Sequence, residues 1–269
     1  LFVSAIAVAG VCGPPIGGIL ADHLGVRWGF GLAAAVAASA LLALIAVPRD
    51  DPTGLAAQPP APKITDFLRL LARSRFVLVT ILAAVPAKAI LASFCFYLVP
   101  LYTLALGATT ATAGRALMVY SGIMVLVLPL AAWLAERGVR EARLVGIGLC
   151  LSTLGGFGLY TLDGLMPVYL AMALLGFGQG LSIAAQSSLL SIACAREIEE
   201  RGSGPVFGVY RLIERLGNAS GPILAGVLVV QFGHRGAFAV IAGAVLVCGL
   251  LFLALGRNLG APRPGEVAA

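Results

Sequence analysis

Residues Gly13 to Phe30 read GPPIGGILADHLGVRWGF, and residues Gly221 to Phe238 read GPILAGVLVVQFGHRGAF. Both stretches place proline inside an apolar segment, although a proline in the interior of a soluble helix costs about 3 kcal/mol. A single shift of 208 residues aligns Gly13 with Gly221, Pro14 with Pro222, Gly18 with Gly226, Gly25 with Gly233, Arg27 with Arg235 and Phe30 with Phe238. Because these identities fall in one register, they indicate an internal repeat.

The composition predicts a protein that is embedded in a membrane. Hydrophobic residues make up 60% of the 269 positions and charged residues only 11%, whereas a globular domain carries about 25% charged residues. The net charge of +6 does not indicate nucleic-acid binding, because the basic residues lie in the gaps between apolar runs. The 34 glycines suit helices that approach each other closely in lipid.

Eight apolar runs reach the roughly 20 residues that a membrane span requires. They cover about 1–21, 27–47, 76–106, 112–135, 143–162, 166–194, 205–232 and 236–256. The sequence therefore predicts an all-α membrane protein with eight transmembrane helices.

One gap between the runs is long and is predicted to link two domains. Residues 48–75 open with a proline-rich segment that is typical of a flexible linker. Thr65 to Ser74 places apolar residues opposite two arginines, which predicts a short helix on the membrane surface, with a polar loop as the alternative. The predicted division is a helix pair at 1–47, this cytoplasmic linker, a six-helix bundle at 76–256 and a cytoplasmic tail at 257–269.

The distribution of basic residues predicts the orientation, because cytoplasmic loops are enriched in Lys and Arg. The second gap holds Arg49, Lys63, Arg69, Arg73 and Arg75, the fourth Arg137, Arg140 and Arg143, the sixth Arg196 and Arg201, and the tail Arg257 and Arg263. The odd-numbered gaps hold only Arg27 and Arg235, with Arg115 just past the third. We therefore expect the even gaps and the C-terminus to be cytoplasmic, in a bacterial plasma membrane.

The repeat resembles a known transporter plan. Its two copies end spans one and seven, so the repeat unit is six helices with the same direction both times, as in parallel-repeat transporters. The GPPIGG core at Gly13–Gly18 is similar to the GPxxGG antiporter motif of the major facilitator superfamily, with Ala9 where a glycine is expected. The resemblance implies a twelve-helix fold of two six-helix halves, of which this chain holds helices five to twelve and lacks the first four.

The resemblance also implies how the repeat packs. The fifth helix of the family packs against the eighth, here 112–135, and this contact stabilises the outward-closed state. Pro14 bends the first span, and small residues let a neighbouring helix approach; a structural kink without a gating role is the alternative. The residues assigned to this packing motif are Ala9, Gly13, Pro14, Gly17, Gly18, Gly221, Pro222 and Gly226.

Lys88 is the first candidate for a functional residue inside a span. Ionisable groups at membrane depth are costly, which makes them functional candidates, and Lys88 lies about 12 residues into the third span, two positions after Pro86. The resemblance places this span beside the central cavity. We expect Lys88 to attract an anionic solute group or to pair with a carboxylate on the absent helices; the alternative is that it snorkels or forms a structural ion pair.

Other polar residues also lie within the predicted spans. Gln179, Ser182 and Gln186 form one helical stripe, which either lines an aqueous cavity or forms hydrogen bonds across a helix contact. Asn218, Tyr97 and Tyr120 are further candidates for the solute pathway, although tyrosines near span ends are often interface anchors.

Charged residues near the predicted cytoplasmic side form a second expected group. Glu214 is flanked by Arg211 and Arg215, which favours a structural ion network over a proton carrier. Glu136, Arg137 and Arg140 resemble a worn form of the family's loop motif. The expected network comprises Glu136, Arg137, Arg140, Arg211, Glu214 and Arg215.

These observations predict a secondary transporter that moves a small solute by alternating access, with proton-coupled efflux implied by the antiporter motif. Neither an enzymatic site nor a nucleotide-binding loop is present in the sequence, and the separated His23 and His234 and the five cysteines, each in a different apolar run, indicate neither metal nor cofactor. The alternatives are a non-transporting sensor or scaffold, a symporter that takes up an anionic solute, and a passive channel.

Overall fold

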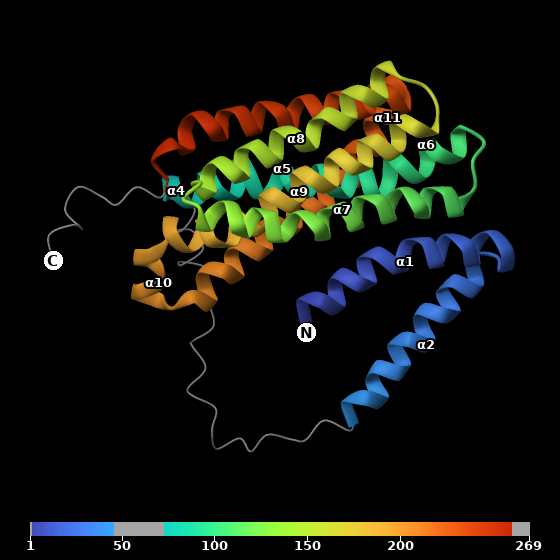
Figure 1. The fold of residues 1–269 in the computed structure, drawn as a ribbon, viewed down its shortest axis with the longest axis horizontal. Coiled ribbons are helices and arrows are strands. Elements are labelled where there is room, and N and C mark those ends of the chain that lie inside the picture. The colour runs from blue at the N-terminus through green and yellow to red at the C-terminus, as the bar shows by residue number, and fades with distance from the viewer. Residues whose placement is uncertain (1, 46–72, 260–269) are drawn as a thin grey trace, which may run out of the picture.

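The computed structural model describes residues 2–45 and 73–259, and within these ranges the regular structure is helical (Figure 1). The segments are α1 (Phe2–Leu24), α2 (Val26–Ile45), α4 (Ser74–Val79), η2 (Thr80–Ala84), α5 (Val85–Ser93), η3 (Phe94–Leu98), α6 (Val99–Ala105), α7 (Thr110–Glu136), α8 (Glu141–Thr161), α9 (Leu165–Ala193), α10 (Ala195–Arg201), α11 (Ser203–Leu255) and η4 (Gly256–Asn258). Most of the predicted linker, its surface helix and the end of the tail lie outside the described residues.

Five of the described helical segments are long and apolar enough to cross a membrane: Ser74–Ala105, Thr110–Glu136, Glu141–Thr161, Leu165–Ala193 and Ser203–Leu255. A shorter apolar helical stretch covers Val26–Leu41. The predicted spans at 205–232 and 236–256 lie within one helical segment, α11, which bends sharply at Gly233. The all-helical membrane bundle is thus confirmed.

The repeated glycine adopts the same unusual backbone conformation in both copies. Gly25, between α1 and α2, has a φ of 87°, and Gly233, within α11, has a φ of 69°. The ψ of Gly233 is 176°, which places it in a region that is essentially restricted to glycine. Each glycine reverses the chain direction, so both copies form helical hairpins, as the ribbon shows for α1–α2 and for the two limbs of α11 (Figure 1).

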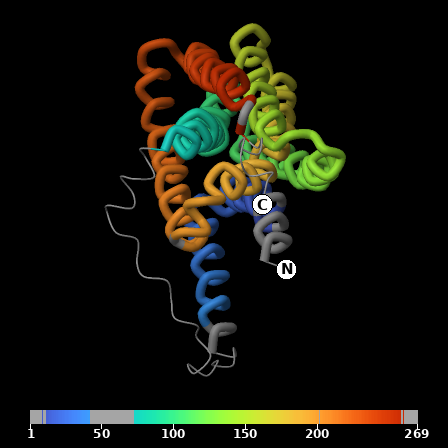
Figure 2. The backbone as a smooth tube through the Cα atoms, turned by 90° about the vertical axis from the view of Figure 1, so that its left-hand side faces the viewer, coloured from blue at the N-terminus to red at the C-terminus, as the bar shows by residue number. Residues whose placement is uncertain are grey.

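The bundle has two distinguishable ends. The connections α1–α2 and α6–α7, the α8–α9 loop and the bend of α11 all lie at one end, on the right of Figure 1, which we call the Gly25 end. The α7–α8 turn, α10 and the last turn of α11 lie at the opposite end, which we call the Gly138 end. α1 packs along α7, whereas α2 extends away from the bundle (Figure 2).

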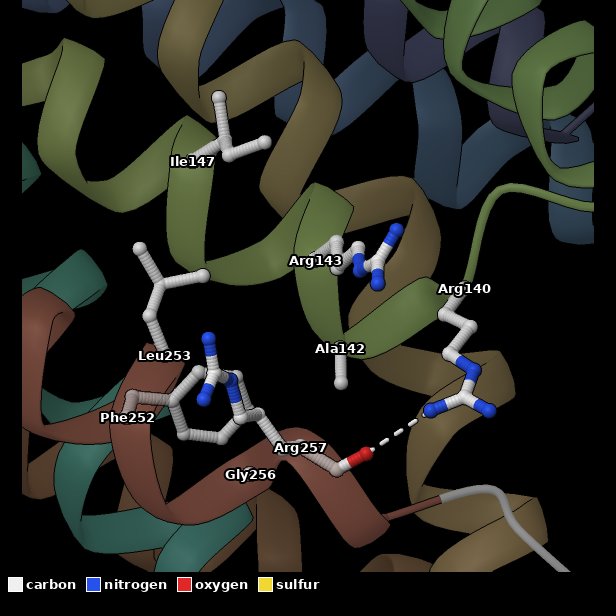
Figure 3. A pocket seen from close by; sticks show the side chains of 8 residues that line it. All are labelled: Arg140, Ala142, Arg143, Ile147, Phe252, Leu253, Gly256 and Arg257. Carbon is white, nitrogen blue, oxygen red and sulfur yellow. Dashed lines mark hydrogen bonds between the residues drawn. The ribbon is translucent and has the colours of Figure 1, made fainter.

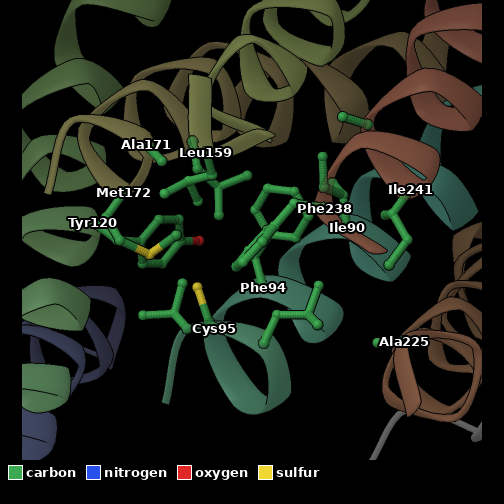
Figure 4. Packing of buried hydrophobic residues seen from close by; sticks show 14 of the residues in the cluster. Ile90, Phe94, Cys95, Tyr120, Leu159, Ala171, Met172, Ala225, Phe238 and Ile241 are labelled. Atoms are coloured by element: carbon green, nitrogen blue, oxygen red, sulfur yellow. The ribbon is translucent and has the colours of Figure 1, made fainter. Parts of the chain in front are cut away.

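Two large clusters of buried side chains and a small third one, Val127, Ala131 and Leu181, form the core of the described residues. The cluster toward the Gly25 end contains Phe94 and Phe238, whose rings meet edge to face with centroids 4.9 Å apart (Figure 4). The cluster toward the Gly138 end contains Phe76 and Phe252. Lipid tails are as apolar as these side chains, so helix association in a membrane depends on close packing.

Glycines provide that close packing between α8 and α9. A methyl group on Gly148 would lie 2.5 Å from the carbonyl oxygen of Gly178. Because the obstructing atom belongs to the backbone, it cannot move aside as a flexible side chain would. The short distance between α8 and α9 therefore requires glycine at both positions.

Candidate functional site

A layer of polar side chains crosses the bundle between the two apolar clusters. It is formed by α5, α9 and α11, each of which contributes apolar residues to both large clusters or packs against them. Lys88 lies on α5, Gln179 and Gln186 on α9, and Glu214 on α11. Polar groups in the interior of a membrane protein are costly unless they are paired, so their pairing defines the site.

Glu214 is the buried centre of a group of three charges. The Nζ of Lys88 lies 3.3 Å from one carboxylate oxygen of Glu214, and a guanidinium nitrogen of Arg211 lies 2.8 Å from the other. The Glu214 side chain is 6% exposed and that of Lys88 15%, whereas Arg211 is 58% exposed. Each carboxylate oxygen therefore has its own cation, and removing the carboxylate would leave a largely buried ammonium without an opposite charge.

This arrangement matches the alternative that the sequence offered for Lys88 and part of the expectation for Glu214. Lys88 pairs with a carboxylate on α11, which is the structural ion pair given as the alternative in the sequence analysis. Arg211 contacts Glu214 as expected, but Arg215 is exposed and forms no ion pair with Glu214 in the part of the chain that the structure describes. The reason is geometric, because Lys88 reaches Glu214 across the contact between α5 and α11.

The glutamine stripe of α9 lies at helix–helix contacts. The amide nitrogen of Gln179 donates to the carbonyl oxygen of Ala87 at 2.9 Å, which joins α9 to α5. The amide nitrogen of Gln186 donates to the hydroxyl of Ser182 at 2.8 Å, and its oxygen accepts from the Tyr210 hydroxyl at 3.0 Å, which joins α9 to α11. The stripe is buried and cross-links the helices on either side of Lys88.

Two polar atoms in this layer have no hydrogen-bond partner among the described residues. They are the side-chain oxygens of Gln179 and Asn218. A buried acceptor without a donor carries a desolvation cost of about 1–3 kcal/mol. Such atoms are well suited to accept hydrogen bonds from a solute or from water.

Two π-helical segments flank Lys88 and were not anticipated from the sequence. η2 ends where the Val85 N–H donates to the carbonyl of Thr80, and η3 ends where the Val99 N–H donates to Phe94. A proline, Pro86 or Pro100, is the second residue after each segment. Because π-helical turns are frequent at functional sites, the two X-Pro steps were the available sequence signal.

The contact between α1 and α7 is made by backbone atoms. A methyl group on Gly18 would lie 2.7 Å from the carbonyl oxygen of Thr110, and one on Gly114 would lie 2.5 Å from the carbonyl oxygen of Pro14. The first repeat copy therefore does pack against 110–136, the helix expected from the resemblance. The approach is so close that neither position has room for a side chain.

Other members of the packing motif are placed differently. A methyl group on Gly13 or Gly17 would meet no atom within 4 Å among the described residues, and Ala9 is exposed. These residues lie on a face of α1 that does not contact α7, so they do not form the contact expected of them. In the second copy, Gly221 faces the carbonyl oxygen of Ala89 at 2.6 Å from the methyl position.

The remaining residues of the second copy and the two tyrosines lie within the bundle. Pro222 is half-buried in α11, and the methyl position of Gly226 lies 3.2 Å from the hydroxyl of Tyr97. Tyr120 is buried in the cluster toward the Gly25 end, where its hydroxyl donates to the sulfur of Met124 at 3.3 Å. Figure 4 shows the Tyr120 hydroxyl directed into that cluster.

Asp22 joins the two helices at the Gly25 end, and sequence reasoning missed it. Its carboxylate accepts hydrogen bonds from the backbone N–H of Thr110 at 3.0 Å, from that of Ala111 at 2.9 Å, and from the Thr110 hydroxyl. These hydrogen bonds lower the pKa of Asp22 to about 2. The bond from the Thr110 hydroxyl has the largest effect, and the bond from the Ala111 N–H the next largest. The available signal was its spacing, because Asp22 lies one helical turn after Gly18.

The predicted charged residues near the Gly138 end do not form one network. Glu136 is exposed, Arg137 lies over the ring of Trp133 at 4.1 Å, and Arg140 donates to the carbonyl oxygen of Arg257 at 3.0 Å. The Arg211–Glu214 pair belongs instead to the polar layer on α11. The six residues were grouped because the sequence places them near one side, whereas their partners differ.

Comparisons with known proteins agree with this architecture. Residues 1–204 match the family described as Major Facilitator Superfamily. The enterobactin exporter EntS of Salmonella paratyphi A is 29% identical over 259 residues, which cover 92% of this chain and 58% of the exporter. EntS of Shigella flexneri is 29% identical over 253 residues, covering 92% and 57%. The chain thus spans 58% or less of the length of these relatives.

A solved structure shows the same fold. The crystal structure of a peptide transporter POT in complex with alafosfalin aligns with a TM-score of 0.53 at 19% identity, over 79% of this chain and 43% of the transporter chain. At this identity the alignment supports the fold and carries no information on the solute.

Proposed function

The chain belongs to the Major Facilitator Superfamily, and from that membership we propose that it is part of a secondary transporter that exports a small solute by alternating access, with a proton gradient as the energy source. The family consists of membrane transporters and not enzymes. The curated relatives are named as exporters, which supports efflux over the uptake that the same fold permits.

The observation that carries this proposal is the largely buried pair of Lys88 and Glu214, with the exposed Arg211 on the second carboxylate oxygen. Burying charges inside a membrane bundle is costly, and an apolar core would pack the same helices at lower cost. A functional use for the charge explains its presence. We propose that the anionic group of a solute competes with Glu214 for Lys88, while the Gln179 and Asn218 oxygens accept hydrogen bonds from N–H or O–H groups elsewhere on the same solute.

We further propose that a four-helix segment precedes this chain in the complete transporter and covers the open face of α1. The second repeat copy supplies the argument, because Gly221 packs on α5 whereas its counterpart Gly13 meets no described atom within 4 Å. By repeat symmetry, Gly13 and Gly17 would pack on the counterpart of α5, which is the first helix of the other half. This gives eight spans here and twelve in total.

The proposed orientation places the Gly138 end and the C-terminus in the cytoplasm of a bacterial cell. Arg137, Arg140, Arg196 and Arg257 lie at that end, whereas Arg27 and Arg235 lie at the Gly25 end. The excess of basic residues on one side supports this orientation. The Asp22 contact would then close the outer side of the transporter.

A proteoliposome flux assay on the complete transporter tests these proposals, with enterobactin as the first probe because the relatives are named for it. Wild type should move the probe faster when a pH gradient is imposed, and Lys88→Ala should reduce the flux about tenfold or more. Arg211→Ala is the matched control, because it removes the other cation of Glu214 from a mostly exposed position.

The possible outcomes separate the parts of the proposal. Equal losses in Lys88→Ala and Arg211→Ala would mean that both act by stabilising Glu214, and would remove Lys88 from the solute pathway. If the flux is the same with and without the imposed pH gradient, proton coupling is excluded. If the wild type moves no enterobactin, that solute is excluded. If it moves none of a broad panel of anions, a non-transporting scaffold is favoured.

A further inference from the structure

A basic cavity lies between the start of α8 and the end of α11, at the Gly138 end and away from the polar layer (Figure 3). Its volume is about 660 Å³. Its lining residues are Arg140, Ala142, Arg143, Ile147, Phe252, Leu253, Gly256 and Arg257. Three of these carry positive charge and none is acidic, so the cavity concentrates positive potential against an apolar wall.

The three arginines are arranged around the cavity, and their charges are not neutralised by the described protein. Arg140 donates to the carbonyl oxygen of Arg257, which ties the start of α8 to the end of α11. Figure 3 shows the guanidinium groups of Arg143 and Arg257 on either side of the space. Within residues 73–259, none of the three forms an ion pair with a carboxylate.

The remaining wall is apolar and faces the surface of the bundle. Ile147 is 46% exposed, and Leu253 lies over Gly146, where a methyl group would come within 2.5 Å of the Leu253 Cγ. Further along the same two helices, Leu154 and Leu250 are also exposed. Exposed apolar side chains therefore continue from the arginines along α8 and α11 toward the middle of the bundle.

On the proposed orientation, we propose that this cavity binds the phosphate of an anionic phospholipid, with the acyl chains lying along the exposed apolar side chains that begin at Ile147 and Leu253. Arginine recognises phosphate through paired N–H donors, and basic pockets between transmembrane helices on the cytoplasmic side bind lipid headgroups. A free phosphate ion would use the arginines but not the exposed apolar wall. The bound lipid would join the second limb of α11 to α8.

Native mass spectrometry of the complete transporter, with phosphatidylglycerol or phosphatidylcholine added, tests this proposal. Phosphatidylglycerol should be retained in preference to phosphatidylcholine. Arg143→Gln with Arg257→Gln should weaken its retention by about fivefold per arginine. Arg143→Lys with Arg257→Lys keeps the charge and should retain most of it. Arg137→Gln is the matched control, since this exposed arginine of the same end lies over Trp133 and does not line the cavity.

Three outcomes would overturn the proposal. Equal retention of the two lipids would show that the cavity does not select a headgroup charge. Loss in Arg137→Gln as large as in the double Gln variant would show that the charge of the whole end matters, and not the cavity. If millimolar inorganic phosphate protects the wild type against unfolding and phosphatidylglycerol does not, the cavity binds the free ion and not the lipid. The Lys variant separates these outcomes from misfolding.

Discussion

Gly114→Ala should shift the transporter away from the state in which α1 and α7 are in contact at the Gly25 end. The added methyl group would lie 2.5 Å from the Pro14 carbonyl oxygen and 3.1 Å from the Pro15 Cα. Both obstructing atoms are backbone, so the helices themselves must move apart. Relieving an overpacked contact of this kind costs about 1–3 kcal/mol.

That cost applies only to the state in which the helices touch, because the clash disappears once they separate. A differential free energy of about 1–3 kcal/mol changes the ratio of two states about 5- to 150-fold. Replacing glycine by alanine within a helix also raises helix propensity by up to about 1 kcal/mol. Gly122→Ala corrects for this gain, because Gly122 lies on the same helix and its methyl group would meet no described atom within 4 Å.

The assay is a distance measurement between spin labels at Val26, in the α1–α2 hairpin, and Leu162, in the α8–α9 loop, on a cysteine-free complete transporter. Both positions are exposed, at 60% and 51%. Gly114→Ala should populate a longer distance, and Gly122→Ala should reproduce the wild-type distribution. Identical distributions in the two variants, both folded, would refute the reasoning that this contact separates two states.

Three further predictions concern the charges and the bends. Glu214→Ala should destabilise the protein by about 3–5 kcal/mol because it leaves buried Lys88 unpaired, whereas Glu214→Leu combined with Lys88→Met should recover most of the loss in a thermal or denaturant unfolding experiment. The pKa of Asp22 is lowered from its ordinary 3.8 to about 2, so its contribution to the stability of the α1–α7 contact is present above pH 3.8 and is lost as the pH falls through about 2. Protection of the Thr110 amide from hydrogen exchange, measured relative to Asp22→Asn, should therefore stay constant between about pH 5 and 8. Gly233→Ala should destabilise by about 1–3 kcal/mol because of its backbone conformation, whereas Gly243→Ala, in the same helix with open space around it, should not.

The hairpins were predictable from the sequence because their determinants are local. Proline and glycine fix the backbone within a few residues, and the aligned Gly25 and Gly233 both adopt the positive φ that ends one helix and begins the next. Apolar length likewise identified the helices to within a few positions. Which faces of α1 touch another helix was not predictable, since Gly13 and Gly18 are equally small and only Gly18 meets α7.

The polar layer was predictable in its members and not in its pairing. A charge such as Lys88 inside an apolar run is visible in any sequence, because it violates the composition around it. Its partner depends on how two helices are aligned along their lengths, and residue 214 lies 126 positions away in the chain. Sequence reasoning therefore placed Glu214 beside Arg211, correctly, and beside Arg215, but did not pair it with Lys88.

Two glycines of α11, one at the start of the second repeat copy and one a helical turn before it, explain that alignment. Methyl groups on Gly217 and Gly221 would lie 2.5 Å and 2.6 Å from the carbonyl oxygens of Val85 and Ala89, so two contacts four residues apart on α11 match two contacts four residues apart on α5. Lys88 lies between the two α5 contacts, and Glu214 lies just before Gly217. The repeat that forms the hairpin therefore also fixes the register that brings Lys88 to within 3.3 Å of Glu214, because any slip along α5 would place a side chain where only glycine fits.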